Sequence, residues 1–289
     1  MTSVDIPALL SWFARAGRAL PWRADGVGAW EILLCEVMSQ QTPVARVEPV
    51  WRAWLETWPG PAELAAASPG DVIRAWGKLG YPRRALRLQE CAVAVVHRHG
   101  GRVPADVDAL LALPGVGHYT ARAVACFAHG RRVPVVDTNV RRVVARAVRG
   151  HAEAGPPSTR RDLESVEALL PDDPRDAVDF SVALMELGAL VCTARVPRCD
   201  ECPLAASCAW VAAGRPEWDG PRRPAQRFAG TDRQVRGLLL DVLRDGDGTA
   251  SRERLDAVWP DDVQRDRALA SLVTDGLVVR TGERYALPG

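Results

Sequence analysis

The 289-residue sequence contains a single lysine, Lys78, and the other 36 of its 37 lysine and arginine residues are arginines. A Schiff base formed by a lysine amine would therefore depend on that one side chain. No apolar run approaches the length of a membrane span, and the N-terminus MTSVDIPALLSW lacks the basic-then-apolar order of a signal peptide. Alternating strand patterns are missing before the last quarter of the chain. These absences argue against a membrane-spanning, secreted or β-rich protein, and we expect a cytoplasmic one.

The composition is that of a soluble globular protein, with 47% hydrophobic and 25% charged residues. The net charge of +1 hides an asymmetry along the chain. Residues 1–150 carry 19 Lys and Arg against 12 Asp and Glu, a balance of +7, whereas the remainder carries 18 against 24, a balance of −6. The basic half is thus the candidate for contact with phosphates, with an ordinary mixed surface as the alternative.

Apolar spacing is helical through most of the chain. Residues 5–19 read as a short helix, and residues 30–98 as several helices broken at Pro59-Gly60-Pro61, Ser68-Pro69-Gly70 and Gly80-Tyr81-Pro82. Further helices are expected at 105–111, 118–128 and 138–148. The predicted fold is all-α in its main part.

The last part of the chain reads differently. Residues 214–228 are rich in Pro, Gly and Arg and are predicted to be a linker. Helical patterns at 232–245, 252–259 and 261–275 then precede two apolar runs around Gly282-Glu283, which predict a β-hairpin. Three helices and a hairpin predict a small winged-helix-like domain over 229–289, with Val278, Val279 and Tyr285 as packing residues of the hairpin. This domain holds 9 Arg against 11 Asp and Glu, which argues against strong binding to phosphates. We therefore expect the domain to position other parts of the protein or to contact a protein partner.

Four of the seven cysteines lie within seventeen residues, in the spacing C-x6-C-x2-C-x5-C. Thiolates at this density hold a metal ion or an iron–sulfur cluster. A disulfide framework fits poorly, since the chain can bury its own core and has no signal peptide. Structural zinc stays open as an alternative, although zinc sites usually show two close cysteine pairs and this run has one. The other three cysteines lie in apolar helical stretches and are predicted to be buried free thiols. The four clustered ligands are Cys192, Cys199, Cys202 and Cys208.

The segment Leu113-Pro114-Gly115-Val116-Gly117 joins two helical stretches. Its two glycines let the backbone approach a ligand and expose N–H groups, and the second helix then begins with its positive dipole end. This arrangement suits a DNA phosphate and reads no sequence. A plain interhelical turn is the alternative.

Three segments together resemble one enzyme family. LPGVGHYTARAVACFA followed by VPVVDTNVRRVVAR is similar to the helix-hairpin-helix plus Asp motif of base-excision DNA glycosylases, and the cysteine spacing resembles the [4Fe–4S] loop of its endonuclease III and MutY branches. LPWR…WEILLCEVMSQQT resembles the adenine-specific MutY branch. The resemblance covers residues 20–208. It implies a two-lobed glycosylase fold, with a cluster lobe at 1–26 and 134–213 and a six-helix lobe carrying the hairpin at 27–133.

The resemblance also implies roles for individual residues. Glu36, on an apolar helix, would be the acid that protonates adenine at N7, and a half-buried carboxyl is expected to have a raised pKa. Asp137, which otherwise could simply cap a helix, would stabilise the cationic sugar. Asn139 would orient these groups. Tyr119 stands where endonuclease III enzymes carry their lysine, so strand cleavage is not expected, and the tyrosine would polarise the Asp137 site or pack as an aromatic.

Other residues are implied in DNA contact. Gln41 would fill the base stack once adenine leaves it. Adenine recognition would involve Trp22 and Arg23. The remaining members of the predicted DNA-binding set are Tyr81, Pro82, Arg83, Gly115, Val116 and Gly117.

Three departures from the MutY pattern are visible. Pro82 stands where relatives often have a second aromatic wedge, and a proline cannot stack like a ring. Val182 replaces the Gln or Glu expected near the flipped adenine. Residues 229–289 are too few for the Nudix-like domain that senses 8-oxoguanine in most relatives.

The sequence therefore predicts a monofunctional DNA glycosylase that excises adenine opposite 8-oxoguanine or guanine in base-excision repair. It would be a monomer with a [4Fe–4S] cluster, associated with the nucleoid through double-stranded DNA containing A·8-oxoG or A·G mismatches. Two alternatives stay open: a thymine or uracil mismatch glycosylase of the same superfamily, and a non-catalytic DNA-binding protein.

Overall fold

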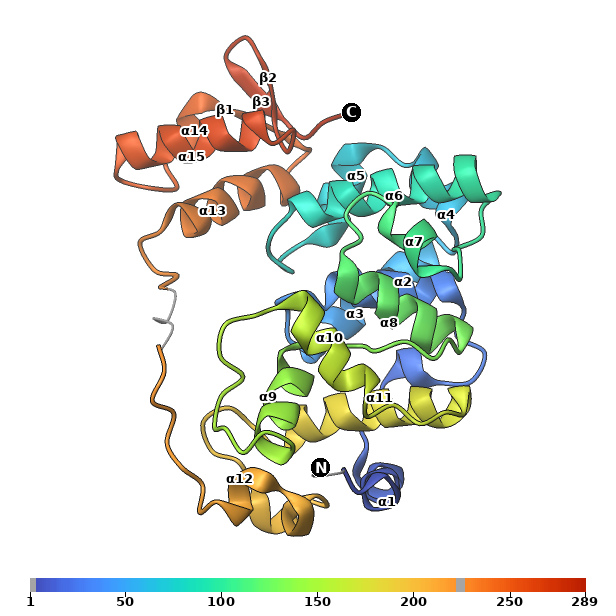
Figure 1. Cartoon of the computed structure of the whole chain (residues 1–289). Helices are drawn as coiled ribbons and strands as arrows, with labels where there is room; N and C mark the ends of the chain where they lie inside the picture. The colour runs from blue at the N-terminus through green and yellow to red at the C-terminus, as the bar shows by residue number, and fades with distance from the viewer. Residues whose placement is uncertain (1–3, 222–226) are drawn as a thin grey trace. The chain divides into compact units, whose positions relative to one another are not determined.

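The computed structural model describes residues 4–221 and 227–289, and helices make up most of them (Figure 1). Three short 3₁₀ helices and three short strands accompany the α-helices in these ranges. The α-helices are α1 (Ile6–Ala16), α2 (Ala29–Met38), α3 (Val44–Thr57), α4 (Pro61–Ala66), α5 (Pro69–Trp76), α6 (Arg83–His99), α7 (Val107–Leu111), α8 (His118–His129), α9 (Thr138–Ala147), α10 (Thr159–Glu167), α11 (Pro174–Leu190), α12 (Ala209–Ala212), α13 (Asp232–Arg244), α14 (Arg252–Asp256) and α15 (Asp262–Thr274). The 3₁₀ helices are η1 (Pro21–Arg23), η2 (Cys199–Glu201) and η3 (Ala205–Ser207), and the strands are β1 (Thr249–Ser251), β2 (Val279–Thr281) and β3 (Arg284–Ala286).

Helix boundaries follow the local signals of the sequence. Helices α4 and α5 begin at prolines, whose missing N–H costs nothing in a first turn. Ser68 caps α5 by accepting the N–H of Asp71 at 3.1 Å, and its hydroxyl donates to the Asp71 carboxylate. The three predicted breaks in residues 30–98 are thus confirmed as helix boundaries.

The chain divides into two units by its internal contacts. The first consists of residues 1–32, 105–111 and 117–223, and the second of residues 33–104, 112–116 and 224–289. The predicted lobe boundaries stay a prediction. Part of the predicted linker, residues 222–226, lies outside the described residues, as do residues 1–3.

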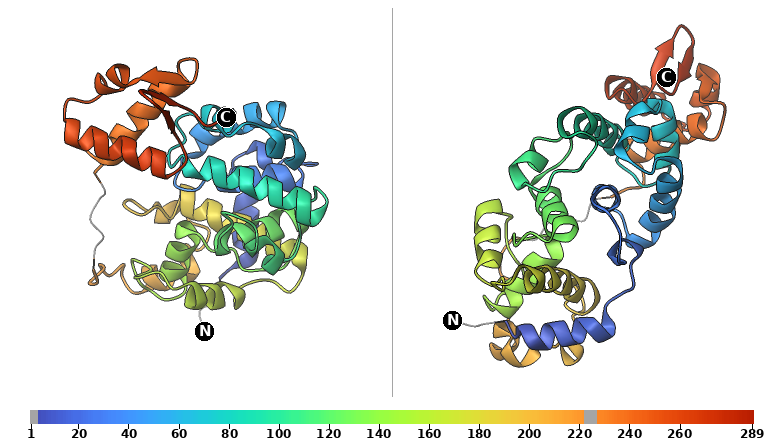
Figure 2. Two further views of the ribbon diagram at one scale, coloured as in Figure 1. Left: turned by 90° about the horizontal axis from the view of Figure 1, so that it is seen from above. Right: turned by 90° about the vertical axis from the view of Figure 1, so that its right-hand side faces the viewer.

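In the first unit, α11 packs against both α1 and α9 (Figure 2), and these three helices supply most of its apolar core. Phe180 of α11 is fully buried in this cluster, which also contains Val140 and Val144 of α9 and Leu9 of α1. Helix α9 shows why the sequence folds this way, because its valines fall on one face and its arginines on the other. The cysteines of the clustered run pack against the same core.

In the second unit, α3 to α6 enclose several tryptophans. The rings of Trp54 and Trp76 meet edge to face with centroids 5.6 Å apart, and both side chains are buried. Buried Gln89 of α6 donates from its amide to the Ala67 carbonyl at 2.6 Å, which closes the C-terminal end of α4. Helix α6 is thereby fixed against α4.

The C-terminal module comprises α13, α14, α15 and a three-stranded antiparallel sheet of order β1-β3-β2 (orange to red in Figure 1). The predicted hairpin around Gly282 is confirmed as β2 and β3, with Arg280 paired to Tyr285. Strand β1 was not predicted, because three residues give no readable alternation. Val278 and Tyr285 are buried as expected, but the prediction that Val279 packs is wrong, since it is 44% exposed. A strand alternates its faces, so Val279 points away from the side that Val278 occupies.

Among the described residues, none of the helices has both the length and the apolar character needed to cross a membrane.

Candidate active site and nucleic-acid interface

Asp137 lies at the N-terminus of α9 and is half-buried. One carboxylate oxygen accepts the backbone N–H of Val140 at 2.7 Å, which is an ordinary N-cap bond. The other oxygen accepts the side-chain amide of Asn139 at 2.8 Å. The capping role and the predicted orienting contact from Asn139 thus occur together in one carboxyl group.

Opposing effects set the protonation of Asp137. Burial raises the pKa of this carboxyl above its ordinary value, while the hydrogen bonds from Val140 and Asn139 and the charge of Arg142 oppose the rise. The net pKa stays above the ordinary value, so these contacts offset only part of the effect of burial.

Arg142 connects this site to the cysteine-rich loop. Its guanidinium donates to the Asn139 side-chain oxygen at 2.8 Å, to the Gly188 carbonyl at 2.6 Å and to the Cys192 carbonyl at 2.7 Å. Gly188 allows this close approach of α11 to α9, because an added Cβ there would lie 2.7 Å from the Cβ of Asn139. A continuous set of hydrogen bonds thus runs from Asp137 to the backbone of Cys192.

Glu36 lies near the C-terminal end of α2, where its helical neighbours Leu33, Cys35, Val37 and Met38 are buried. Its own side chain is half-buried. The helix thus carries an ionisable group in a mainly apolar setting, as the sequence predicted.

Arg84 of α6 ties the end of α2 to two neighbouring loops. It donates to the Val37 carbonyl at 2.7 Å, to the Thr42 hydroxyl at 3.1 Å and to the Gly80 carbonyl at 3.0 Å. Its guanidinium also lies 5.0 Å from the ring centroid of Trp76. Burial lowers the pKa of Arg84 to about 10, so the side chain keeps its charge at neutral pH.

The two loops that Arg84 ties together hold strained, exposed residues. Gln41 has a φ of 56° and Tyr81 a φ of 46°, and side chains rarely adopt this left-handed region. Gln41 is next to Thr42, and Tyr81 is next to Gly80. The two side chains predicted to probe DNA are therefore held in conformations that α2 and α6 maintain through Arg84.

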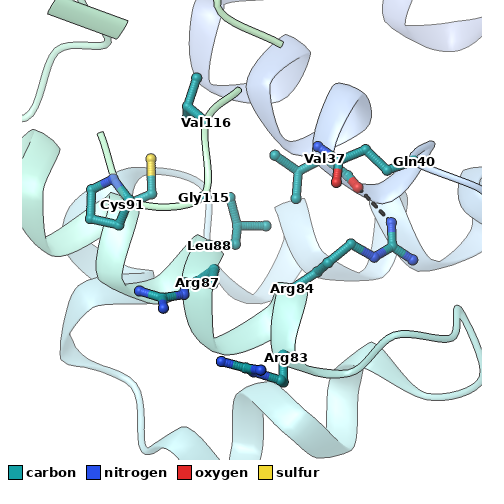
Figure 3. A pocket seen from close by; sticks show the side chains of 10 residues that line it. Val37, Gln40, Arg83, Arg84, Arg87, Leu88, Cys91, Gly115 and Val116 are labelled. Atoms are coloured by element: carbon teal, nitrogen blue, oxygen red, sulfur yellow. Dashed lines mark hydrogen bonds between the residues drawn. The ribbon is translucent and has the colours of Figure 1, made fainter. Parts of the chain in front are cut away.

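The hairpin residues Gly115 and Val116 line a pocket of about 290 Å³ (Figure 3). Gly115 has a φ of 75°, and a Cβ there would lie 2.9 Å from the Cβ of Arg87, so only glycine fits. Arg83 and Arg87 lie at the rim, both more than half exposed. The pocket joins the hairpin backbone to two exposed arginines, Arg83 paired with Asp275 and Arg87 paired with Glu90. Arginines and backbone N–H groups are the groups that contact DNA phosphates. Gly117 caps α8 at the end of the hairpin, and Pro82 precedes α6.

Tyr119 packs with its half-buried ring against a small apolar cluster that contains Ala123, Cys126 and Val135. Aromatic packing is one of the two roles that the sequence analysis gives Tyr119.

Trp22 lies half-buried in η1. Arg23, from the same turn, donates to a buried carboxylate at 2.9 Å and is 24% exposed.

That carboxylate belongs to Glu186 of α11, which is 1% exposed and which the sequence analysis missed. It accepts from Arg18 at 2.6 and 2.9 Å and from Arg23 at 2.9 Å. Burial alone would raise the pKa of Glu186, but the hydrogen bonds from Arg18 and Arg23 outweigh it and lower the pKa to about 2. The available signal was an acid within the apolar run LMELGAL, the same signal that marked Glu36.

We predict that Glu186→Ala lowers the free energy of unfolding by about 3–5 kcal/mol, because it leaves two guanidinium groups without their buried partner. In the wild type, the stabilisation from Glu186 should be present above pH 4.5 and be lost as the pH falls toward 2, since the folded-state pKa lies below the ordinary one. Urea unfolding at a series of pH values measures both effects. A loss below about 1 kcal/mol, the size typical of exposed pairs, would contradict the prediction.

The clustered cysteines line one cavity, with Arg146 and Trp210 in its wall. Arg146 is 3% exposed, and its guanidinium lies 3.4 Å from the Cys192 sulfur and 4.8 Å from the Trp210 ring centroid. It also donates to the Thr193 carbonyl at 2.7 Å. The Arg146 guanidinium thus fixes the loop and lies next to the thiols.

In the part of the chain that the structure describes, no group of three or more His, Cys, Asp or Glu residues is arranged to hold a metal ion. All seven cysteines are free, and Cys35, Cys91 and Cys126 are buried, as predicted.

Arg84, Arg142 and Arg146 were also missed by the sequence analysis. Each lies in a helix whose arginines are numerous, and sequence alone does not distinguish a buried arginine from a solvated one.

Comparison with known proteins identifies related chains. Residues 34–168 match the model of the HhH-GPD superfamily base excision DNA repair proteins. The chain is 61% identical to the adenine DNA glycosylase of Mycolicibacterium smegmatis, over 99% of this chain and 97% of that one. It is 35% identical to the thymine/uracil-DNA glycosylase of Pyrobaculum aerophilum, over 68% of this chain and 87% of that one. The solved structure of a thermostable thymine-DNA glycosylase superposes with a TM-score of 0.66 at 28% identity, covering 72% of this chain and 95% of that one.

Proposed function

The chain belongs to the HhH-GPD superfamily of base excision DNA repair proteins, and from that premise we propose that it is a monofunctional adenine DNA glycosylase. Its substrate would be double-stranded DNA in which adenine is mispaired with 8-oxoguanine or guanine. The observation that carries the proposal is the 61% identity to an adenine DNA glycosylase along nearly the whole chain, cysteine loop and C-terminal module included.

Glu36 would act as the general acid. Adenine leaves poorly as an anion, so the break of its bond to the deoxyribose needs a proton on the base, at N7. A half-buried carboxyl on an apolar helix is suited to keep that proton until it is needed.

Asp137 would stabilise the sugar. As the bond to the base breaks, its electron pair leaves with adenine and positive charge develops on the deoxyribose. The amide of Asn139 and the N–H of Val140 hold the carboxylate in place, and Arg142 holds Asn139. Water then adds to the sugar and loses a proton, which restores the protonated Glu36, so that neutral adenine and an abasic site remain.

The cysteine loop would hold a [4Fe–4S] cluster through Cys192, Cys199, Cys202 and Cys208. Four thiols around one cavity, with the buried cation of Arg146 beside them, fit an anionic group held by four thiolates. When bound, the cluster would cross-link this loop, and base release requires no step on it. The same loop exposes Arg195, which would contact phosphates, and Arg198, which pairs with Glu201 at 2.9 Å.

We predict that the purified protein contains about four irons per chain and absorbs broadly in the visible range. Cys202→Ala should lose most of this iron and weaken binding to duplex DNA, because the loop that carries Arg195 and Arg198 loses its cross-link. Metal analysis and visible absorption measure the first effect. Cys126→Ala, a buried thiol in α8, is the matched control. Stoichiometric zinc without iron, or unchanged iron in Cys202→Ala, would contradict the ligand set.

The target adenine must leave the base stack before either carboxyl can act on it. The exposed Gln41 would fill the space it leaves, while Tyr81 and Pro82 contact the duplex nearby. Arg83 and the hairpin residues Gly115, Val116 and Gly117 would hold the backbone.

We expect adenine release without strand cleavage. Tyr119 cannot form a Schiff base, and Lys78 is exposed and paired with Asp241 at 3.6 Å. Borohydride trapping should yield little covalent adduct, and strands should break only after hot alkali. Robust cleavage at neutral pH would place the enzyme among the lyases.

The thymine/uracil relative makes mismatch thymine glycosylase the second candidate. Single-turnover release from A·8-oxoG, A·G and G·T duplexes separates the two. We expect release from the adenine duplexes, and release confined to G·T would overturn the proposal.

A further inference from the structure

The C-terminal module is built into the second unit rather than tethered to it. Ile73 of α5 belongs to the same buried cluster as Val235 and Leu239 of α13. Arg244 donates to the Ile73 carbonyl at 3.1 Å, and Arg83 pairs with a carboxylate of the module. Figures 1 and 2 show the module beside α5. Its residues are therefore held in fixed positions next to α5 and the start of α6.

Arg233 of this module reaches the strained loop that precedes α6. Its guanidinium donates to the Tyr81 hydroxyl at 2.8 Å and lies 5.6 Å from the centroid of the Tyr81 ring. The same guanidinium lies 5.2 Å from the ring centroid of Phe228. One cation thus joins two aromatic rings from different parts of the chain.

Both rings are open to solvent. Tyr81 is 38% exposed and Phe228 is 53% exposed, and among the exposed large hydrophobic residues of the described chain these two are the aromatic ones. The rest of that group are valines. Aromatic rings and arginine guanidinium planes stack on unpaired nucleobases, and stacking of this kind tolerates any base.

The cluster continues a surface already suited to DNA. Tyr81 is two residues before Arg83, which lines the pocket beside the hairpin backbone of Gly115 (Figure 3). Arg84 holds the loop from its other side, with its guanidinium 5.8 Å from the Tyr81 ring centroid. Tyr81 is therefore fixed by two arginines, one from α6 and one from the C-terminal module.

We propose that Arg233 and Phe228 of the C-terminal module extend the surface of Tyr81, which the proposed function already places at the duplex, into a stacking site for the base that loses its neighbours when adenine leaves the helix. Arg233 is the positioning residue, and Phe228 supplies a second ring. The C-terminal module thereby takes part in substrate recognition. The inference rests on the proposed function, because it takes the mismatched duplex as its ligand.

The test measures binding of the full-length protein, at one salt concentration, to two duplexes that differ at a single pair. One contains 8-oxoguanine opposite a non-cleavable adenosine analogue, and the other is fully paired. Phe228→Ala and Arg233→Ala should each weaken binding to the mismatched duplex by about tenfold, the loss expected for one stacked base, and binding to the paired duplex by less than about twofold. Arg233→Lys should restore little, because an ammonium group does not stack.

Two substitutions in the same module serve as controls. Val263→Ala removes an exposed apolar side chain, and Arg254→Ala removes an exposed charge, without touching the cluster. Both should bind the two duplexes like the wild type. Thermal unfolding checks that Arg233→Ala leaves the module docked, and the exposed Phe228 can be truncated without opening the core.

Mismatch binding within about twofold of wild type in Phe228→Ala and Arg233→Ala, or equal losses on both duplexes, would overturn the inference. Adenine release by the wild type is measured in parallel. A wild type that releases no adenine overturns the proposed function, whereas normal release with unaffected variant binding overturns the stacking site alone.

Discussion

Replacing Glu36 with glutamine is expected to lower single-turnover release of adenine by about 100- to 10,000-fold, the usual contribution of a general acid. Glutamine has nearly the same size and can keep the helical packing of α2, but its amide carries no proton that it can donate to N7. Binding to a mismatched duplex should stay close to the wild-type value, because the substitution removes a proton donor and not a contact surface.

The matched control is Glu48→Gln on α3, whose exposed carboxylate pairs with Arg52 at 2.9 Å. Loss of that pair should change stability by less than about 1 kcal/mol and leave release unchanged. Equal release by Glu36→Gln and Glu48→Gln would remove Glu36 from the chemistry.

Much of the fold could be predicted because helix boundaries depend on residues close to them in the sequence. Pro61, Pro69 and Pro82 mark the starts of helices, and the hairpin around Gly282 follows from two short apolar runs. Strand β1 could not be predicted, since its three residues become a strand only by pairing with β3. The face of the sheet on which Val279 lies is likewise decided by the register of the strands.

The individual site residues could be named from motifs, but not the contacts that hold them. Asp137, Asn139 and the cysteines stand out by type and spacing. Arg142 and Gly188, which connect them, are ordinary in the sequence and gain their role only because α11 lies against α9. Long-range hydrogen bonds of arginine depend on tertiary packing, and no local pattern records them.

Glu186 shows that an acidic residue within an apolar helix does not by itself identify a catalytic group. It is an acid in an apolar helix, as Glu36 is, and the sequence gives no way to tell them apart. The structure shows that Glu186 pairs with Arg18 and Arg23 in the core of the first unit, which gives this acid a structural role.

Asp137→Asn is expected to reduce adenine release by a factor comparable to that of Glu36→Gln, although it should hardly affect the fold. Asparagine is as good an N-cap as aspartate, so the bond from the Val140 N–H can persist and α9 keeps its start. What disappears is the negative charge that would face the developing sugar cation. The substitution therefore separates the two functions that this carboxyl combines.

Asp173→Asn provides the comparison, because Asp173 caps α11 in the same unit through the N–H groups of Arg175 and Asp176. Both variants should unfold at nearly the wild-type denaturant concentration, whereas Asp137→Ala should lose about 0.5–2 kcal/mol with its cap. Release measured under single turnover should then fall in Asp137→Asn alone. If Asp137→Asn and Asp173→Asn release adenine equally well, Asp137 is only a helix cap, and the sugar cation must be stabilised by another group.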